Sequence, residues 1–321
     1  MVNSEGNRMR VGIDIGGTKI VAGVVGGDGV VVHSKRIATQ TEKGYDGVKE
    51  DIIRLVRTVL DEAHIAARAV EQIGIATAGQ IEKVSKKILF SPNMGWRNVP
   101  LKDDIENAFG VKTCIENDAN AATYGEWKFG LKGVPQDVLG IFIGTGIGGG
   151  LILDGKLYRG FSNVGAEVGH TILNPYGYRC NCGNNGCFEA YCGGAYIVER
   201  VKKKIEEGYR GKIFDLIGGD IGHLHTGIIE EAYLLGDDLC VHVWQEVIEY
   251  LGAGVASLVN LLNPQIVVFG GGVIYGTKYL IDEMNVVLKK RAMDASLKGL
   301  EIKKATLGEN AALLGVSYIE E

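Results

Sequence analysis

The sequence lacks three features that would each point to a broad class of protein. It has no apolar run long enough to cross a bilayer, and its first residues, MVNSEGNRMR, lack the apolar stretch of a secretory signal. It also has no excess of basic residues: the net charge is −5, and the pI near 5.8 argues against a nucleic-acid surface. We therefore expect a cytoplasmic protein that binds neither membranes nor nucleic acids.

Cysteine is scarce, with six residues in 321, yet four of them fall within Gly165–Gly194. There the spacing Cys180-x-Cys182-x₄-Cys187, with His170 upstream, offers three thiolates and one imidazole. This donor set is typical of a structural zinc site with no open coordination position. Disulfides are the alternative, which a cytoplasmic location disfavours. The remaining cysteines are expected to be buried thiols: Cys114, Cys192 and Cys240.

Glycine, by contrast, is abundant: the 48 glycines cluster at the ends of apolar, β-branched runs. In DIGGTK a strand ends at Asp14, and the bare N–H groups of Gly16 and Gly17, with the hydroxyl of Thr18, could cradle phosphate oxygens. Asp14 could hold water on a magnesium ion. The segment matches neither a Walker loop nor GxGxxG, so an ordinary tight hairpin is the alternative.

The same glycine-turn pattern occurs twice, in IDIGGTKIVAGVV at 13–25 and IFIGTGIGGGLIL at 141–153. Both segments read strand, glycine turn, strand, and the second turn is expected at Gly144–Gly150, with Thr145 supplying a hydroxyl. A third cluster, FGGGV, lies between a strand and a helix, where N–H groups favour a ribose-phosphate. Three such turns predict a nucleotide-binding site.

The repeat predicts two like-folded α/β domains with ligand in the cleft between them. We place them at residues 1–117 and 118–309, with the zinc loop at 165–194 in the second. A last helix, about 310–321, is expected to pack back on the first domain. SPNMGWRNVP is expected to be a loop because it is rich in Gly, Pro and Asn.

Asn117 and Asp118 follow a predicted strand and precede an Ala-rich helix. An Asp at this point is an expected helix N-cap. It would also lie at the carboxyl end of a strand, where open α/β sheets bind ligands and where it could accept a proton from a substrate hydroxyl. The position alone favours neither role, and one residue could serve both.

Taken together, DIGGTK, END before an Ala-rich helix, GTGIGGG, GAEVGH and CNCGNNGCFE resemble the ROK family of repressors, uncharacterised reading frames and sugar kinases, from Arg10 onward. The resemblance implies the α/β class with a duplicated ribonuclease H-like fold, as in the actin-like ATPase and hexokinase superfamily. SPNMGWRNVPL is similar to the glucokinase branch. GIATAGQI departs from the GxPGPV-like loop common there, which leaves the exact sugar open.

The resemblance also implies roles for single residues, with Asp118 as the catalytic base. It implies a sugar-binding set of Gly79, Asn93, Asn117, Asp118, Glu167, His170 and Glu189. It implies an ATP-binding set of Asp14, Gly16, Gly17, Thr18, Lys19, Gly144, Thr145, Gly146, Gly270, Gly271 and Gly272. The zinc ligands would be His170, Cys180, Cys182 and Cys187.

The function implied is Mg²⁺- and ATP-dependent phosphorylation of a hexose at its 6-hydroxyl, with glucose giving glucose 6-phosphate. N-acetylmannosamine, mannose or fructose are alternative substrates, because pocket shape rather than the motif residues discriminates among sugars. A sugar-responsive repressor is the alternative from another class. It would need a helix-turn-helix segment, and only nine residues precede Arg10. The family further implies a homodimer or homotetramer.

Overall fold

The computed structural model describes residues 9–320. The N-terminal stretch considered for a signal, except its last two residues, and the final residue of the expected last helix lie outside this range. The chain forms two compact units. The first comprises the described residues up to Gln136, Gly150–Ala166 and the residues from Thr306; the second comprises Asp137–Gly149 and Glu167–Ala305. These limits differ from the division expected at Asp118.

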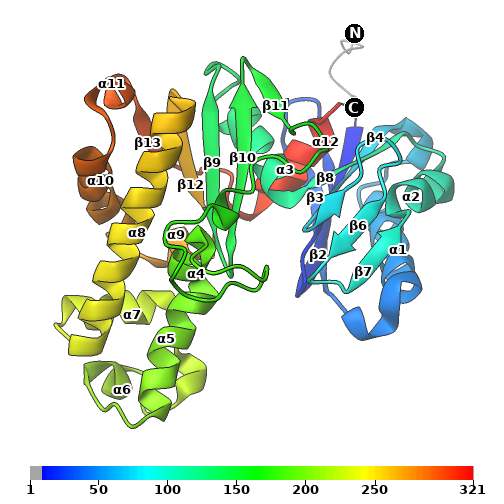
Figure 1. Ribbon diagram of the computed structural model, residues 1–321. Coiled ribbons are helices and arrows are strands. Elements are labelled where there is room, and N and C mark those ends of the chain that lie inside the picture. Colours follow the sequence, from blue (N-terminus) through cyan, green and yellow to red (C-terminus); the bar gives the residue numbers. More distant parts are fainter. Residues whose placement is uncertain (1–8, 321) are drawn as a thin grey trace. The chain divides into compact units, whose positions relative to one another are not determined.

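The first unit is built on a five-stranded sheet with the strand order β3-β2-β1-β4-β8 (Figure 1). Its strands are β1 (Met9–Ile15), β2 (Lys19–Val25), β3 (Val31–Ala38), β4 (Val70–Thr77) and β8 (Thr113–Asn117). The first three strands form an antiparallel meander with short glycine-containing connections. β4 runs parallel to both β1 and β8, so three carboxyl ends point the same way.

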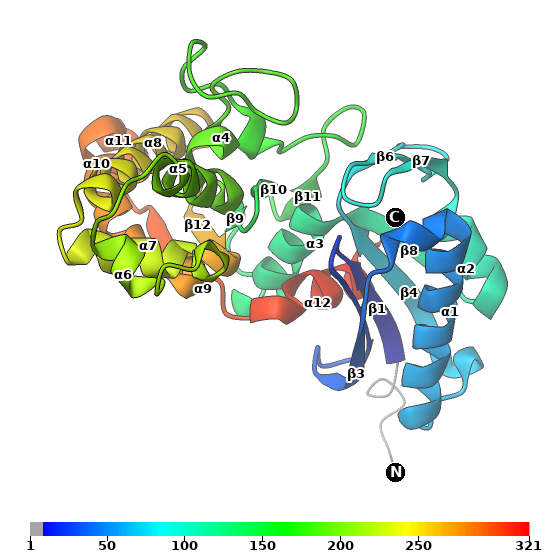
Figure 2. The same ribbon diagram turned by 90° about the horizontal axis from the view of Figure 1, so that it is seen from below.

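Helices cover both faces of this sheet (Figure 2). α1 (Gly44–Glu62) and α2 (Leu101–Phe109) lie on one face, and α3 (Asp118–Gly125) and α12 (Ala311–Tyr318) lie on the other. α1 buries one apolar face, whose residues follow the helical period. This face comprises Val48, Ile52, Leu55, Val56, Val59 and Leu60.

α12 approaches the sheet so closely that strand glycines meet its backbone. A Cβ atom built on Gly12 would lie 2.2 Å from the carbonyl oxygen of Leu313, and one on Gly74 would lie 2.1 Å from that of Val316. A side chain at either position would therefore force the helix off the sheet. The buried amide of Gln72 also donates to the Ile319 carbonyl, at 2.8 Å.

A small antiparallel sheet of order β5-β6-β7 lies where a loop was expected. Its strands are β5 (Gln80–Ile81), β6 (Ile88–Ser91) and β7 (Trp96–Val99). The loop expectation was wrong because Pro92, Asn93 and Gly95 occupy the turn between β6 and β7, whereas Trp96–Val99 pair with β6 as a strand. Trp96 is buried, and the ring of Tyr45 from α1 meets it edge-on with 5.4 Å between centroids.

The second sheet has the strand order β11-β10-β9-β12-β13. Its strands are β9 (Val138–Ile143), β10 (Ile147–Leu153), β11 (Lys156–Tyr158), β12 (Ile266–Gly270) and β13 (Glu301–Lys304). Numbered along the chain, both sheets run third, second, first, fourth, fifth strand, so the predicted duplication is confirmed. The turn expected at Gly144–Gly150 is shorter than predicted: β10 begins at Ile147, and Gly144 N–H donates to the Gly146 carbonyl at 3.0 Å.

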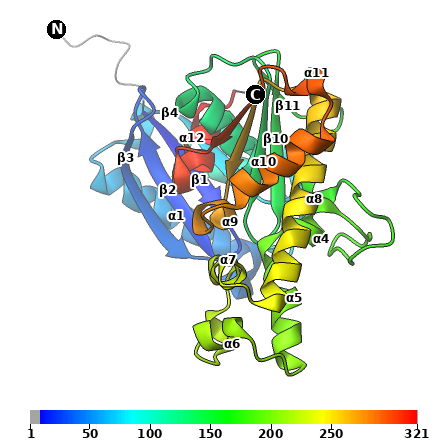
Figure 3. The ribbon, with the colours of Figure 1, turned by 90° about the vertical axis from the view of Figure 1, so that its left-hand side faces the viewer.

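The remaining helices belong to the second unit: α4 (Phe188–Cys192), α5 (Gly194–Glu206), α6 (Lys212–Leu216), α7 (Thr226–Leu234), α8 (Asp238–Leu262), α9 (Gly272–Gly276), α10 (Leu280–Arg291) and α11 (Asp294–Leu297). α10 packs along α8 (Figure 3). Within residues 9–320 no helix, α8 included, is long and apolar enough to cross a membrane. Shorter turns are η1 (Thr41–Lys43), η2 (Ala67–Ala69), η3 (Glu126–Gly130), η4 (Val168–His170), η5 (Ile221–His223) and η6 (Gly308–Asn310).

The contact between α12 and the sheet predicts the effect of filling it. We expect Gly74→Ala to lower the free energy of unfolding by about 3 kcal/mol, since backbone rather than a flexible side chain blocks the new methyl group. Urea denaturation measures this. Gly276→Ala is the matched control, because a Cβ there meets nothing within 4 Å. Equal losses in the two variants would contradict the packing argument.

Candidate active site

Three parallel strands of the first unit end at the same level of the sheet. Ile15 of β1 pairs with Thr77 of β4, and Thr77 pairs with Asn117 of β8. The segments that follow these strands therefore emerge at one edge: the first glycine turn, the Gly79 segment and the start of α3. This is the edge at which open α/β sheets bind ligands.

The first glycine turn is closed and supported by its neighbours. Gly16 N–H donates to the Lys19 carbonyl at 2.9 Å, so it is not the bare donor that the sequence predicted, and the hydroxyl of Thr39 donates to the Gly16 carbonyl at 2.7 Å. Asn93 lies against the turn, since a Cβ on Gly17 would be 3.2 Å from the Asn93 Cβ. The structure thus brings a predicted sugar-binding residue beside the predicted phosphate turn.

Lys19 has a partner that the sequence did not indicate. Its ammonium group donates to Glu309 at 2.7 Å, and both side chains are exposed, at 40% and 74%. This pair would have to separate for Lys19 to meet a phosphate. At such exposure the ion pair contributes little free energy, so separation costs little.

Asn117 and Asp118 divide the two roles that the sequence left open. Asn117 caps α3, because its side-chain oxygen accepts from the N–H groups of Ala119 at 2.9 Å and Asn120 at 3.1 Å. Asp118 is the first helical residue, and one carboxylate oxygen accepts from Ala119 N–H at 2.9 Å. The helix is therefore capped without Asp118, whose carboxylate is not needed for that purpose.

Two carboxylates at this edge carry raised pKa values. Burial raises the pKa of Asp118 above its usual range, although the hydrogen bond from Ala119 N–H opposes the shift. Burial raises the pKa of Asp14 from 3.8 to about 7, and the charge of Asp118 adds to the effect while Lys19 opposes it. Such a pair suits a proton acceptor beside a site that attracts a cation.

In the second unit, two glycine turns follow neighbouring parallel strands. β12 pairs with β9, with Gly270 opposite Phe142, so Gly144–Gly146 and Gly270–Gly272 emerge at one sheet edge. The first of these turns is fixed to the start of α5 by hydrogen bonds from Gly194 N–H to the Gly144 carbonyl at 2.9 Å and from Ala195 N–H to that of Thr145 at 3.0 Å. The helix expected after the third glycine cluster is short, α9.

Glu189 connects this turn to the cysteine cluster. Its carboxylate accepts from Ile147 N–H at 2.7 Å and lies 4.0 Å from the Cys180 sulfur. A Cβ on Gly146 would lie 2.1 Å from a Glu189 oxygen, so only glycine leaves room for this carboxylate. Glu167 and His170 lie at η4, where His170 N–H donates to the Glu167 carbonyl at 3.0 Å.

The four predicted metal ligands converge. The Nδ1 or Nε2 of His170 and the sulfurs of Cys180, Cys182 and Cys187 all lie within 4.8 Å of one another. Cys182 and Cys187 are 3.6 Å apart, and the Cys180 sulfur is 3.8 Å from His170 Nδ1. A tetrahedral zinc with Zn–S bonds of about 2.3 Å requires sulfurs about 3.8 Å apart, so the donors fit zinc. All six cysteines are free thiols, and Cys114, Cys192 and Cys240 are buried.

The predicted sugar-binding residues divide between the units. Gly79, Asn93, Asn117 and Asp118 belong to the first, and Glu167, His170 and Glu189 to the second. Within each unit they gather near a glycine turn.

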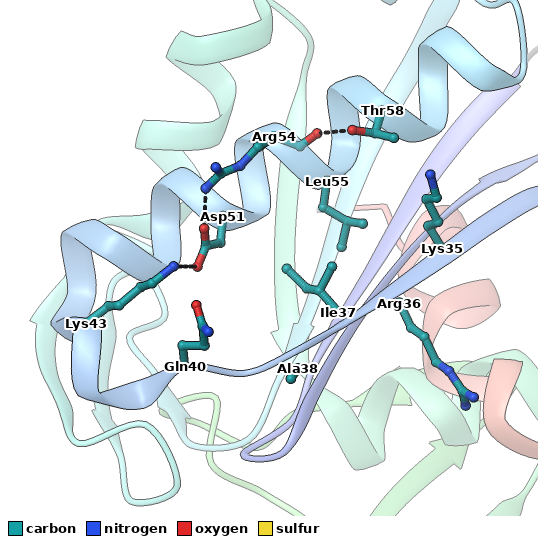
Figure 4. Close-up of a pocket in the computed structure, with 10 residues that line it drawn as sticks. All are labelled: Lys35, Arg36, Ile37, Ala38, Gln40, Lys43, Asp51, Arg54, Leu55 and Thr58. Carbon is teal, nitrogen blue, oxygen red and sulfur yellow. Dashed lines mark hydrogen bonds and ion pairs between the residues drawn. The ribbon is translucent and has the colours of Figure 1, made fainter.

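A cavity of about 470 Å³ in the first unit lies elsewhere, between β3 and α1 (Figure 4). Asp51 at its rim accepts from Lys43 at 2.8 Å and from Arg54. In the close-up, Arg36 points away from the other lining side chains. None of the predicted site residues lines this cavity.

Sequence reasoning missed two buried carboxylates around α3. Glu116 precedes Asn117 and pairs with Arg159, and Glu126 follows α3 and accepts from Thr306 N–H at 3.0 Å. Both are almost fully buried, at 1% and 2% exposure. The sequence signal was Glu116 itself, an acidic residue directly after the apolar pair Cys114 and Ile115.

The raised pKa of Asp14 predicts a pH-dependent stability. The folded state holds a proton on Asp14 that the unfolded chain has lost, so the free energy of unfolding falls as the pH rises from about 4 to 7. We expect Asp14→Asn to match the wild type near pH 4 and to exceed it by about 2 kcal/mol at pH 8. Urea denaturation across this range, at low salt and without nucleotide, measures the difference. Asp46→Asn, at an exposed carboxylate, should show no such trend.

Known proteins resemble this chain over nearly its whole length. A glucokinase of Streptomyces coelicolor is 32% identical over 312 residues, which cover 96% of each chain. A crystal structure of a ROK family glucokinase from Streptomyces griseus, in complex with glucose and AMPPNP, superposes with a TM-score of 0.81 at 33% identity and covers 96% of this chain and 98% of that one.

A relative with another activity is also similar. The xylose repressor of Caldicellulosiruptor bescii is 32% identical over 271 residues, covering 83% of this chain and 67% of the repressor. The profile of the ROK family matches residues 10–321. The family match, the two duplicated sheets and the ordered motifs agree, and the chain belongs to the ROK family.

Proposed function

We propose that this chain is an ATP-dependent glucokinase, which transfers the γ-phosphoryl group of ATP to the 6-hydroxyl of glucose and releases glucose 6-phosphate and ADP. The proposal rests on the position and the pKa of the Asp118 carboxylate. This carboxylate lies at the carboxyl end of β8, is not the cap of α3, and has a raised pKa. A raised pKa makes a carboxylate a stronger base, which can take the hydroxyl proton as the new O–P bond forms.

The glycine turns would bind the nucleotide. Gly16–Lys19 and Gly144–Gly146 would hold the phosphates, and Gly270–Gly272 the adenosine side, through backbone N–H groups other than those of Gly16 and Gly144, which donate within their turns. Mg²⁺, when bound, neutralises phosphate charge, and Asp14 would hold it through water. The raised pKa of Asp14 supports this role, because a cation nearby would relieve the repulsion between Asp14 and Asp118.

Sugar hydroxyls would be bound by two groups of side chains. Asn93, Asn117 and Asp118, with the Gly79 segment, form the first group, and Glu167, His170 and Glu189 form the second. Carboxylates and amides suit this task because each can accept two or more hydrogen bonds from hydroxyls. Zinc in the cysteine cluster would fix the second group, since Glu189 lies beside Cys180. Reduced thiols of this kind agree with a cytoplasmic location.

A sugar-responsive repressor is the second candidate, favoured by the similarity to a xylose repressor. The glucokinase relative is covered over 96% of its length, whereas the repressor is covered over 67%. The Asp118 carboxylate, which does not cap α3 and has a raised pKa, supports the kinase. Pocket shape decides which sugar is phosphorylated. The test below therefore includes mannose, fructose and N-acetylmannosamine as alternative substrates.

The test is release of ADP from Mg·ATP with glucose, mannose, fructose, N-acetylglucosamine and N-acetylmannosamine. We expect glucose to be preferred, and Asp118→Asn to retain glucose binding by calorimetry while kcat falls by about three orders of magnitude or more. Asp61→Asn, in an exposed part of α1, is the control and should keep wild-type kcat. Glucose binding without turnover in the wild type would favour the repressor, and an unchanged kcat in Asp118→Asn would exclude Asp118 as the base.

Zinc is tested by metal analysis of the purified protein. We expect about one zinc per chain, and we expect Cys182→Ser to lose both zinc and sugar affinity, because metal binding and local folding are coupled. Cys192→Ala is the control: its thiol is buried against the Val247 carbonyl, at 3.6 Å, and the variant should keep its zinc. Activity that survives chelation in zinc-free protein would refute a scaffolding role for the metal.

A further inference from the structure

Glu116 is a buried carboxylate directly before the proposed sugar-binding and catalytic residues. It belongs to β8 and is 1% exposed. A buried carboxylate is tolerated only when charged or polar partners replace its water. The identity of those partners therefore shows what Glu116 holds in place.

Both carboxylate oxygens of Glu116 are occupied. One accepts from the backbone N–H of Asn117 at 3.0 Å and from the side-chain amide of Asn120 at 3.1 Å. The other accepts from Nε of Arg159 at 2.5 Å. Glu116 thus holds the chain on each side of Asp118: the residue before it through its backbone, and the second residue after it through its side chain.

Arg159 is itself held on a fixed loop of the first unit, which follows β11. Gly165 N–H donates to the Arg159 carbonyl at 3.0 Å and closes the loop. Within this loop the buried side chain of Asn163 donates to the Ile81 carbonyl at 3.2 Å. The guanidinium group therefore meets Glu116 from a position that the fold restrains at two points.

We propose that Glu116 and Arg159 form a positioning pair for the reaction, which fixes the first turn of α3 so that the Asp118 carboxylate faces the sugar hydroxyl. The inference rests on the proposed function, since it requires Asp118 to be the base. Arg159 neutralises Glu116, and Glu116 in turn sets the backbone of Asn117 and the side chain of Asn120. Neither member of the pair needs to touch substrate.

A purely structural role is the competing explanation, and Glu126 provides the comparison. It is a second buried carboxylate of the same unit, 2% exposed, at the far end of α3. It accepts from the Thr306 hydroxyl at 3.1 Å and from Leu307 N–H at 2.7 Å. Glu126 thus joins the helix to the segment before α12. Its loss should destabilise the unit without moving Asp118.

The experiment compares Glu116→Gln with Glu126→Gln in steady-state kinetics with glucose and Mg·ATP, together with melting temperatures. We expect both variants to melt earlier. We expect kcat to fall by about 10- to 100-fold in Glu116→Gln only, because a misplacement of the base by about 1 Å can lower the rate by about 100-fold. KM for ATP should stay within about twofold of the wild-type value. Arg159→Lys should lose less than Arg159→Gln, since lysine keeps the charge but not the planar fork.

Non-additivity gives the second readout. Glu116→Gln should cost nothing further in an Asp118→Asn background, because a positioning residue acts only through the base it positions. Glu116→Gln combined with Arg159→Gln should lose no more kcat than either change alone. This double variant also leaves no unpaired buried charge, so it keeps the test usable if a single variant does not fold.

The outcomes separate the two hypotheses. If the wild type phosphorylates glucose and Asp118→Asn does not, the proposed function stands. The positioning role is then overturned if Glu116→Gln keeps the kcat of Glu126→Gln, or if its loss multiplies with that of Asp118→Asn. A wild type without turnover on any sugar would overturn both proposals.

Discussion

The parallel pairing of β1, β4 and β8 is the constraint on which the first unit's site depends. Its register sets Ile15, Thr77 and Asn117 side by side, so three segments far apart in the chain leave the sheet at one edge. Each strand is followed by a different predicted site segment: the first glycine turn after β1, the Gly79 segment after β4, and an amide and a carboxylate, of Asn117 and Asp118, at the end of β8. A slip of one residue in any pair would turn every following side chain to the opposite face.

This arrangement carries an electrostatic cost. Asp14 and Asp118 come close enough to raise the pKa of Asp14, and burial raises the pKa of both. Two other buried carboxylates, Glu116 and Glu126, have partners on both oxygens, which accept from N–H, hydroxyl, amide or guanidinium groups. Asp14 and Asp118, whose pKa values burial raises instead, suit a site that attracts a cation and a substrate hydroxyl.

Strong local patterns allowed much of the fold to be predicted from the sequence. The duplicated sheets were predicted from the repeated glycine turns between apolar runs. The donor spacing located the cysteine cluster. The hairpin β6–β7 was missed because two strands of four residues with Pro, Asn and Gly between them have no clear period.

The long-range polar pairs could not be predicted from the sequence, for another reason. Glu116 and Arg159 are 43 residues apart, and Lys19 and Glu309 are 290 apart. Nothing local marks either member of these pairs, because any charged residue has many possible partners. The limits of the compact units depend in the same way on which surface α3 and α12 share, which a repeat in the sequence does not reveal.

The close packing of α12 on Gly12 and Gly74 affects the order in which the chain can fold. β1 is synthesised near the start, whereas the helix that covers it lies beyond Thr306, after nearly all of the second unit. On the ribosome, the part of the first sheet that α12 covers must therefore stay exposed while the second unit is made and can already fold. Because Gly12 and Gly74 carry no side chains, this part of the sheet can still accept α12, which is synthesised after the second unit.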